Sequence, residues 1–181
     1  MKTLDRHRLT LVALVAAIGF AIWWGYDYWR EHRFDKVIAA AARHYQLDPA
    51  LIKALIWRES RFNPTARGRA GEMGLMQIRE VAAMEGGFDP AYCFDPSTNI
   101  MAGSCYLKKA LGRYQRTDNP PLYALIDYNA GRGNVLKWQT GAGLTNGQVF
   151  LIQVQFPSSR TYALAILQRA ERYHRRGEFK S

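Results

Sequence analysis

Residues 47–60 read LDPALIKALIWRES and carry the clearest helix signal in the chain. Asp48 suits the N-cap position, because its carboxylate can accept a hydrogen bond from one of the first backbone amides of a helix. Pro49 follows at the first helical position, where its missing N–H group is no loss. We therefore predict a helix that begins here and runs to about Ser60.

An acid lies on this helix where a core residue is expected. Three apolar residues with helical spacing form one stripe: Ile52, Leu55 and Ile56. Glu59 continues the stripe one turn further on. Burial disfavours a charged carboxyl, so we expect the pKa of Glu59 to be raised and the group to be fit for general acid catalysis. The alternative is that Glu59 ends the helix and pairs with Arg58 or Arg61.

The rest of the chain beyond the N-terminal segment is also expected to be mostly α-helical. Capping and breaking residues such as Pro and Gly delimit four more helices: Phe34–Gln46, Asp95–Gln115, Leu122–Gly131 and Pro157–Arg176. Gly131 suits a left-handed C-cap. Residues 63–77 are rich in Gly and polar residues and predict a loop or short hairpin. Strand patterns are nearly absent.

The N-terminus has the layout of an export signal. Residues 1–8 are basic, and residues 9–26, LTLVALVAAIGFAIWWGY, contain no charge. The apolar run ends in Trp and Tyr side chains that prefer a membrane interface, where a cleaved signal would have small residues. We predict a cytoplasmic basic segment at 1–8 and an uncleaved signal anchor or transmembrane helix at 9–29. A cleaved signal and an interfacial helix are the alternatives.

Length and composition fit one globular domain with an appendage. The chain has 181 residues, of which 48% are hydrophobic and 22% charged. Lys and Arg outnumber Asp and Glu by 25 to 15, which gives a net charge of +10. Such a surface attracts polyanions, and both nucleic acid and an anionic cell envelope qualify. Charge alone does not choose between them, and basicity can also serve only solubility.

Cys93 and Cys105 are the only cysteines. Without a nearby histidine cluster they form a poor metal site, whereas in an exported domain they form a candidate disulfide. Two separate thiols are the alternative.

The residues after the predicted helix resemble a known family. Residues 59–66 read ESRFNPTA, and residues 71–78 read GEMGLMQI. They resemble the E-S-x-F-x-P-x-A and G-x-x-G-L-M-Q-I signature of the lytic transglycosylase SLT family. Further matches follow in order: Asn99–Gly103 with Tyr106 and Leu107, Tyr128–Gly131 with Gly133, Val135 and Trp138, and more weakly Pro157 with Arg160 and Tyr162. The resemblance spans a domain at 34–176.

The resemblance implies a fold, an activity and site residues. It implies a goose-type lysozyme-like, mostly helical domain that cleaves peptidoglycan without a metal or cofactor. Glu59 would be the catalytic acid and base, and Tyr128 would place its hydroxyl near the Glu59 carboxyl. The residues expected to bind the glycan are Gln77, Asn129, Ser60, Met76 and Arg79. By residue type alone, Tyr128 and Asn129 would be a core tyrosine and a helix-end asparagine.

Four positions depart from the family pattern. Gly68 stands where a serine is common, Glu72 replaces a small residue, and Ser158 replaces a glutamate. Arg79 follows the Gln-Ile pair where a proline is usual nearby, and could contact substrate carboxylates. None of these changes removes the catalytic acid.

The resemblance leaves three readings of function. A transglycosylase would use the muramyl C6 hydroxyl as acceptor and leave a 1,6-anhydro end, whereas a muramidase would use water. Hydrolysis commonly needs a second carboxyl, for which Glu72, Glu80, Glu85 or Asp89 are the nearby candidates. The third reading is a non-catalytic peptidoglycan-binding component of an envelope assembly. Nucleic-acid binding is the weakest alternative. We expect the bacterial inner membrane, with the domain in the periplasm.

Overall fold

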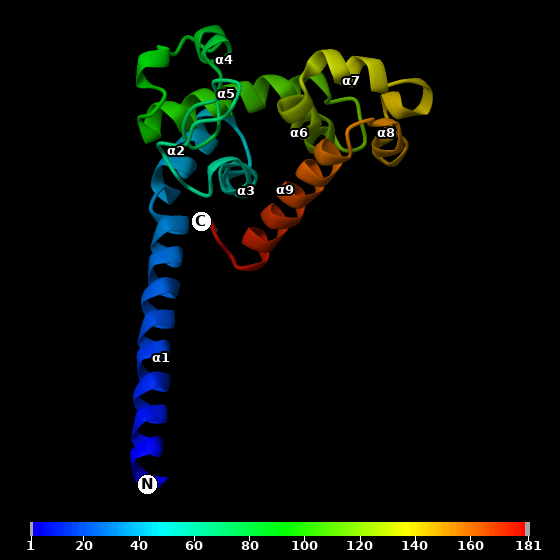
Figure 1. Ribbon diagram of the computed structural model, residues 1–181. Coiled ribbons are helices and arrows are strands. Elements are labelled where there is room, and N and C mark those ends of the chain that lie inside the picture. The colour runs from blue at the N-terminus through cyan, green and yellow to red at the C-terminus, as the bar shows by residue number, and fades with distance from the viewer. Residues whose placement is uncertain (1, 180–181) are drawn as a thin grey trace. The chain divides into compact units, whose positions relative to one another are not determined.

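The chain is helical through most of the part that can be described. The computed structural model describes the backbone of residues 2–179 and the side chains of residues 7–179. It divides the chain into two compact units, Met1–Phe34 and Asp35–Ser181. Within the described residues, extended pairing is limited to two isolated bridges, Arg67 with Met73 and Met73 with Ile78 (Figure 1). The expected mostly α fold is confirmed.

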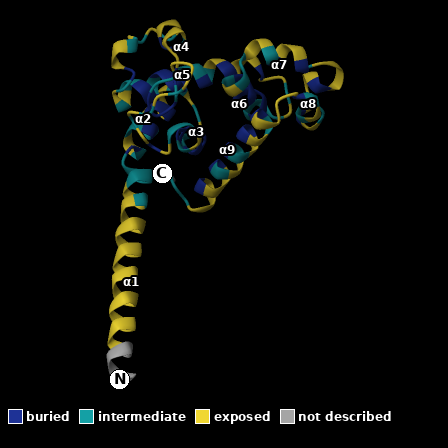
Figure 2. Cartoon of the chain, in the orientation of Figure 1, coloured by how far each residue is buried: buried dark blue, intermediate teal, exposed yellow. Residues whose placement is uncertain are grey.

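The first unit is one long helix. α1 spans Lys2–His32, and its 31 residues make it about 46 Å long at 1.5 Å per residue. An 18-residue window within it has a mean hydropathy of 1.9, and none of that window is buried. Figure 2 shows the exposed surface along this helix. By length and composition α1 can cross a membrane, as a signal sequence also could.

Five helices build the core of the second unit. They are α2 (Asp35–Tyr45), α3 (Pro49–Ser60), α5 (Pro96–Arg113), α6 (Pro120–Ala130) and α9 (Pro157–Arg175). α9 packs most extensively against α3 and α6, while α5 packs against α6 and α2. α3 is central, because every residue from Ala50 to Ile56 is buried. Its burial therefore exceeds the single stripe that the sequence pattern predicts.

The predicted starts of two helices are confirmed by their caps. The Asp48 carboxylate accepts a hydrogen bond from the Ala50 amide at 2.9 Å. Asp95 caps α5 in the same way. Asn119 caps α6, which begins at Pro120, two residues before the predicted start at Leu122. Gly131 ends α6 with φ 83° and ψ 145°, so it has a positive φ but lies outside the left-handed helical region that we expected.

Several short helices escape the sequence pattern. They are α4 (Glu80–Glu85), η1 (Pro90–Tyr92), α7 (Arg132–Trp138), η2 (Gly141–Leu144) and α8 (Gly147–Gln153). Each has at most seven residues. An element of two turns or fewer is too short to show a helical period.

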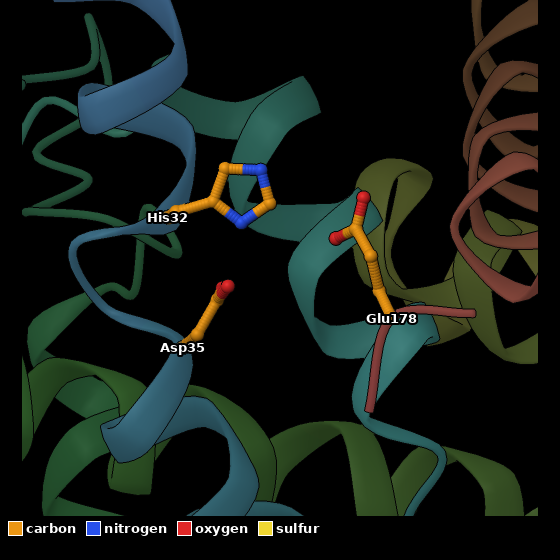
Figure 3. A group of neighbouring side chains, drawn as sticks. All are labelled: His32, Asp35 and Glu178. Carbon is orange, nitrogen blue, oxygen red and sulfur yellow. The ribbon is translucent and has the colours of Figure 1, made fainter. Parts of the chain in front are cut away.

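A buried lysine joins both ends of the second unit to α3. The Lys53 side chain is fully buried, and its ammonium lies 2.8 Å from an Asp35 carboxylate oxygen and 2.7 Å from one of Glu178. Figure 3 shows these two carboxylates, which come from the start of α2 and from the segment after α9. The positive charge is therefore neutralised by two acids that are distant in sequence.

The structure differs from the candidate disulfide, because Cys93 and Cys105 are both free thiols in it. The Cys93 carbonyl accepts a hydrogen bond from Asn99, in the first turn of α5. Cys105 lies six residues beyond Asn99 along this helix.

Candidate active site

The chain turns sharply at the end of α3. Arg61 caps the helix in the left-handed conformation, with φ 52° and ψ 39°, and Phe62 follows with φ 61°. Such a conformation costs about 1–3 kcal/mol for a residue with a side chain. Phe62 is buried, and that burial offsets part of the cost. The turn reverses the chain directly after Glu59, so that the following loop can fold back beside it.

One buried asparagine fixes this loop. Asn99 on α5 accepts a hydrogen bond from the Met76 amide at 2.7 Å and donates to the Met73 carbonyl at 2.8 Å. Gly74 adopts φ 71°, and a Cβ there would lie 2.4 Å from the Asn99 amide nitrogen. The glycine therefore serves both the turn and the close approach. Residues from two separate sequence matches are therefore in contact, and together they fix the conformation of the loop.

The loop, α3 and α6 surround a cavity of about 440 Å³. The residues that line it are Glu59, Glu72, Gln77, Ile78, Arg79, Ala82, Tyr106, Tyr128, Asn129, Ala130 and Gly131. Five residues from the predicted site are brought together here, and Ser60 and Met76 are not among the lining residues. The lining offers two carboxylates, those of Glu59 and Glu72. That no metal or cofactor is required stays a prediction.

Glu59 is a partly buried acid with a neutral partner. The Tyr162 hydroxyl on α9 donates a hydrogen bond to its carboxylate. Burial raises the pKa of Glu59 to about 7, although the Tyr162 hydrogen bond and the charge of Arg58 oppose the rise. Within the described part of the chain Glu59 forms no salt bridge, which argues against the alternative of an arginine pair. Glu59 can therefore hold a proton near neutral pH.

Tyr128 lies at the cavity, but its hydroxyl is engaged elsewhere. It donates a hydrogen bond to the Met76 carbonyl at 2.8 Å, and its ring contacts Tyr106 edge to face at 5.1 Å. Burial raises the pKa of Tyr128 well above its ordinary value, and the charge of Glu59 adds to the rise. The direct partner of Glu59 is Tyr162, which belongs to the weakest of the sequence matches.

Gln77 and Asn129 differ in what they offer to a ligand. Gln77 has φ 49°, and its side-chain amide donates to the Gly74 carbonyl at 2.8 Å, so its nitrogen helps to fold the loop. The Asn129 oxygen accepts a hydrogen bond from Ser159 at 2.7 Å. The Asn129 amide nitrogen has no hydrogen bond to the described residues. It is therefore a donor available in the cavity.

Two of the side chains expected to bind the glycan instead make contacts within the protein. The Ser60 hydroxyl donates to the Ile56 carbonyl at 3.2 Å within α3. The Met76 side chain is fully buried, and its backbone holds Tyr128 and Asn99. Both residues support the cavity wall from behind.

Arg79 and Glu72 give the cavity two charged residues. Arg79 is exposed at the N-cap of α4, and it forms no ion pair with any residue described. Of the four candidate second acids, Glu72 lines the cavity. Glu80, Glu85 and Asp89 are exposed and are not among the lining residues.

Residues 36–150 match the family described as Transglycosylase SLT domain. The chain belongs to this family. The match includes the α3 acid, the loop that folds back beside it and the α6 wall of the cavity. α9, which contributes Tyr162, lies beyond the matched residues.

Curated relatives with this domain are longer than the chain. It is 39% identical over 111 residues to membrane-bound lytic murein transglycosylase F of Desulfosudis oleivorans, covering 60% of this chain and 24% of the relative. It is 32% identical over 171 residues to membrane-bound lytic murein transglycosylase C of Sodalis glossinidius, covering 81% and 48%. The chain thus spans about a quarter to a half of these relatives.

Solved structures share the fold of this SLT domain. The 70 kDa soluble lytic transglycosylase of Escherichia coli superposes with a TM-score of 0.71 at 24% identity, over 80% of this chain and 24% of that one. Lytic transglycosylase Slt of Pseudomonas aeruginosa gives 0.69 at 23% identity, over 81% and 24%. The lysozyme-like helical fold expected from the sequence is confirmed.

Proposed function

We propose that this chain is a peptidoglycan lytic transglycosylase. One observation carries the proposal: a carboxyl with a pKa of about 7 lies at a cavity and accepts a hydrogen bond from a neutral tyrosine. Such a group can donate a proton and take one back within a single turnover. Family membership supports the proposal, as do the relatives that are named lytic murein transglycosylases.

The proposed reaction uses Glu59 twice. Protonated Glu59 gives its proton to the β-1,4 oxygen between N-acetylmuramic acid and N-acetylglucosamine, while the C1–O bond breaks and positive charge develops at C1. The carboxylate then removes the proton of the muramyl C6 hydroxyl, whose oxygen bonds to C1 and closes a 1,6-anhydro ring. No water is consumed, and Glu59 ends protonated. The reaction class is that of a carbon–oxygen lyase.

The other cavity residues take supporting roles in this proposal. Tyr162 orients the carboxyl of Glu59, and Tyr128 fixes the loop through the Met76 carbonyl. The free Asn129 amide donates to the sugar chain, and Gln77 contributes to the same wall. Arg79 contacts a lactyl or peptide carboxylate of the substrate.

Hydrolysis is a second candidate function, because Glu72 brings a second carboxyl to the cavity. A carboxylate there could take a proton from water, which would then attack C1 and leave a reducing muramyl end. The C6 hydroxyl is favoured over water because it is already tethered to the reacting sugar.

Digestion of purified peptidoglycan sacculi tests these functions together. The expected products are muropeptides ending in 1,6-anhydro-N-acetylmuramic acid, each lighter by one water than the hydrolytic product. Mainly reducing muramyl ends would establish the muramidase instead. Binding without release of fragments would leave a non-catalytic envelope component.

We also propose a membrane location for the activity. In this proposal residues 1–8 are cytoplasmic, residues 9–29 form a single-pass anchor in the inner membrane, and the domain at 34–176 lies in the periplasm. The apolar α1 and the relatives named membrane-bound support it. The protein should then fractionate with membranes and keep its N-terminus. A mature N-terminus beyond Tyr26 would show cleavage and a released domain.

A further inference from the structure

Gly68 and Glu72 occupy one space on the cavity loop. A Cβ at position 68 would lie 2.0 Å from the Glu72 Oε2 atom and 2.8 Å from its Cβ. Non-bonded atoms do not approach so closely, and any side chain at 68 would displace the Glu72 carboxylate. The backbone also joins them, because the Gly68 amide donates to the Glu72 carbonyl at 2.8 Å. The absence of a side chain at 68 thus seats the acid at 72.

The Glu72 carboxylate is held without being neutralised. Its Oε2 atom accepts a hydrogen bond from the Ala70 amide at 3.0 Å. Among the described residues it has no salt bridge to lysine or arginine, although Arg79 lines the same cavity. The carboxylate is therefore held, without a basic partner, at the wall where the proposed substrate binds.

Each element packed around Glu59 presents a different charged or titratable group to it. α3 presents Arg58 and α9 presents Tyr162, and both of these favour the ionised carboxyl. α6 presents Tyr128, which interacts electrostatically with Glu59. The loop presents Glu72, whose negative charge raises the pKa of Glu59. Among these groups Glu72 is the acid that opposes ionisation.

We propose that Glu72, seated by Gly68, is a positioning residue whose negative charge keeps the proton on Glu59 and stabilises the positive charge that develops at the reacting sugar carbon. This inference rests on the proposed function. It needs no second covalent step, since Glu72 acts through its charge. A charge fixed in advance at a partly dehydrated site is effective because it requires no reorganisation during the reaction.

The first experiment measures Glu59 ionisation and turnover in the same proteins. In Glu72→Gln, which keeps the shape and removes the charge, the pKa of Glu59 followed by carboxyl NMR should fall by about half a unit. The alkaline limb of the pH–rate profile should move down equally, so that activity at pH 8 falls about threefold. Glu80→Gln, an exposed acid outside the cavity, is the matched control and should leave both curves unchanged.

A second experiment tests the shared space directly. Gly68→Ala should displace the carboxylate and reproduce the kinetic effect of Glu72→Ala. The double variant Gly68→Ala/Glu72→Gly should then be no worse than Glu72→Gly, because glycine at 72 lacks the Cβ that would otherwise lie 2.8 Å from the new one. Thermal melts establish whether each variant is folded. If a variant in this second experiment does not fold, the NMR titration of Glu72→Gln still tests the proposal.

The outcomes separate this inference from the proposed function. An unchanged Glu59 titration in Glu72→Gln would overturn the inference even if the wild type cleaves peptidoglycan. Multiplying effects of Gly68→Ala and Glu72→Gly would overturn the seating by Gly68. If Glu72→Gln shifts the Glu59 titration but the wild type releases no fragments, the charge coupling is retained and the proposed function alone is refuted.

Discussion

Helix α3 carries two ionisable residues six positions apart, and the fold treats them in opposite ways. Lys53 is fully buried and meets two carboxylates, each within 3 Å. Glu59 meets a neutral hydroxyl and has a pKa of about 7. A charge with opposite charges beside it stays ionised and holds elements together. A charge left with a neutral partner can change its protonation state, which is what acid catalysis requires.

The largest expected effect comes from removing the proton that can be transferred. Glu59→Gln should lower the cleavage rate by at least about 10²–10⁴-fold, because the amide keeps the shape of the side chain and cannot act as an acid. The measurement is release of muropeptides from sacculi, with glycan binding and circular dichroism as controls. Near-normal cleavage by the folded variant would remove Glu59 from its proposed role.

Substitution of Lys53, the other ionisable residue compared on α3, should lower the stability of the folded protein. Lys53→Met removes the buried cation and leaves Asp35 and Glu178 facing each other, which should lower the free energy of unfolding by about 3 kcal/mol. Urea denaturation measures this loss. Cleavage per folded molecule should stay close to that of the wild type. A stable but inactive Lys53→Met protein would contradict the division of roles along α3.

Glu59 should also have a stability effect that depends on pH. Its pKa is raised from 4.5 to about 7 on folding, so the folded state loses stability relative to the unfolded state as the pH rises across that window. Glu59→Gln lacks this ionisation and should be more stable than the wild type by about 3 kcal/mol at pH 8. The difference should disappear near pH 4. Parallel stability curves for the two proteins would show that the pKa is not raised.

The smallest expected effects come from removing the hydroxyl groups of Tyr162 and Tyr128. Tyr162→Phe removes the hydrogen bond that favours ionised Glu59, so the alkaline limb of the pH–rate profile should move to higher pH while kcat falls about tenfold. Tyr128→Phe removes the bond to the Met76 carbonyl and should lower stability by about 1 kcal/mol, with a larger loss in turnover as the loop loosens. Equal pH profiles for the two variants would show that neither hydroxyl acts on Glu59.

Local patterns in the sequence predict the helical fold and the acid Glu59. They do not predict which residues contact that acid. The Asp48 cap and the apolar stripe that leads to Glu59 are properties of adjacent residues. The cap is found as predicted, and the stripe is buried together with the rest of the segment from Ala50 to Ile56. The Tyr162 contact depends on the packing of distant segments, and the Gly68–Glu72 contact depends on the backbone conformation of an irregular loop. Sequence spacing does not encode such distances. The short helices after α3 lack a period long enough to recognise.

The Glu59–Tyr162 hydrogen bond joins residues that are 103 positions apart. Closing a loop of this length is entropically unfavourable until the intervening helices have formed and packed. The acid therefore gains its partner only when α9 docks on α3. An unfinished or partly unfolded chain carries a carboxyl without orientation, and the proposed cleavage of peptidoglycan requires the completed fold.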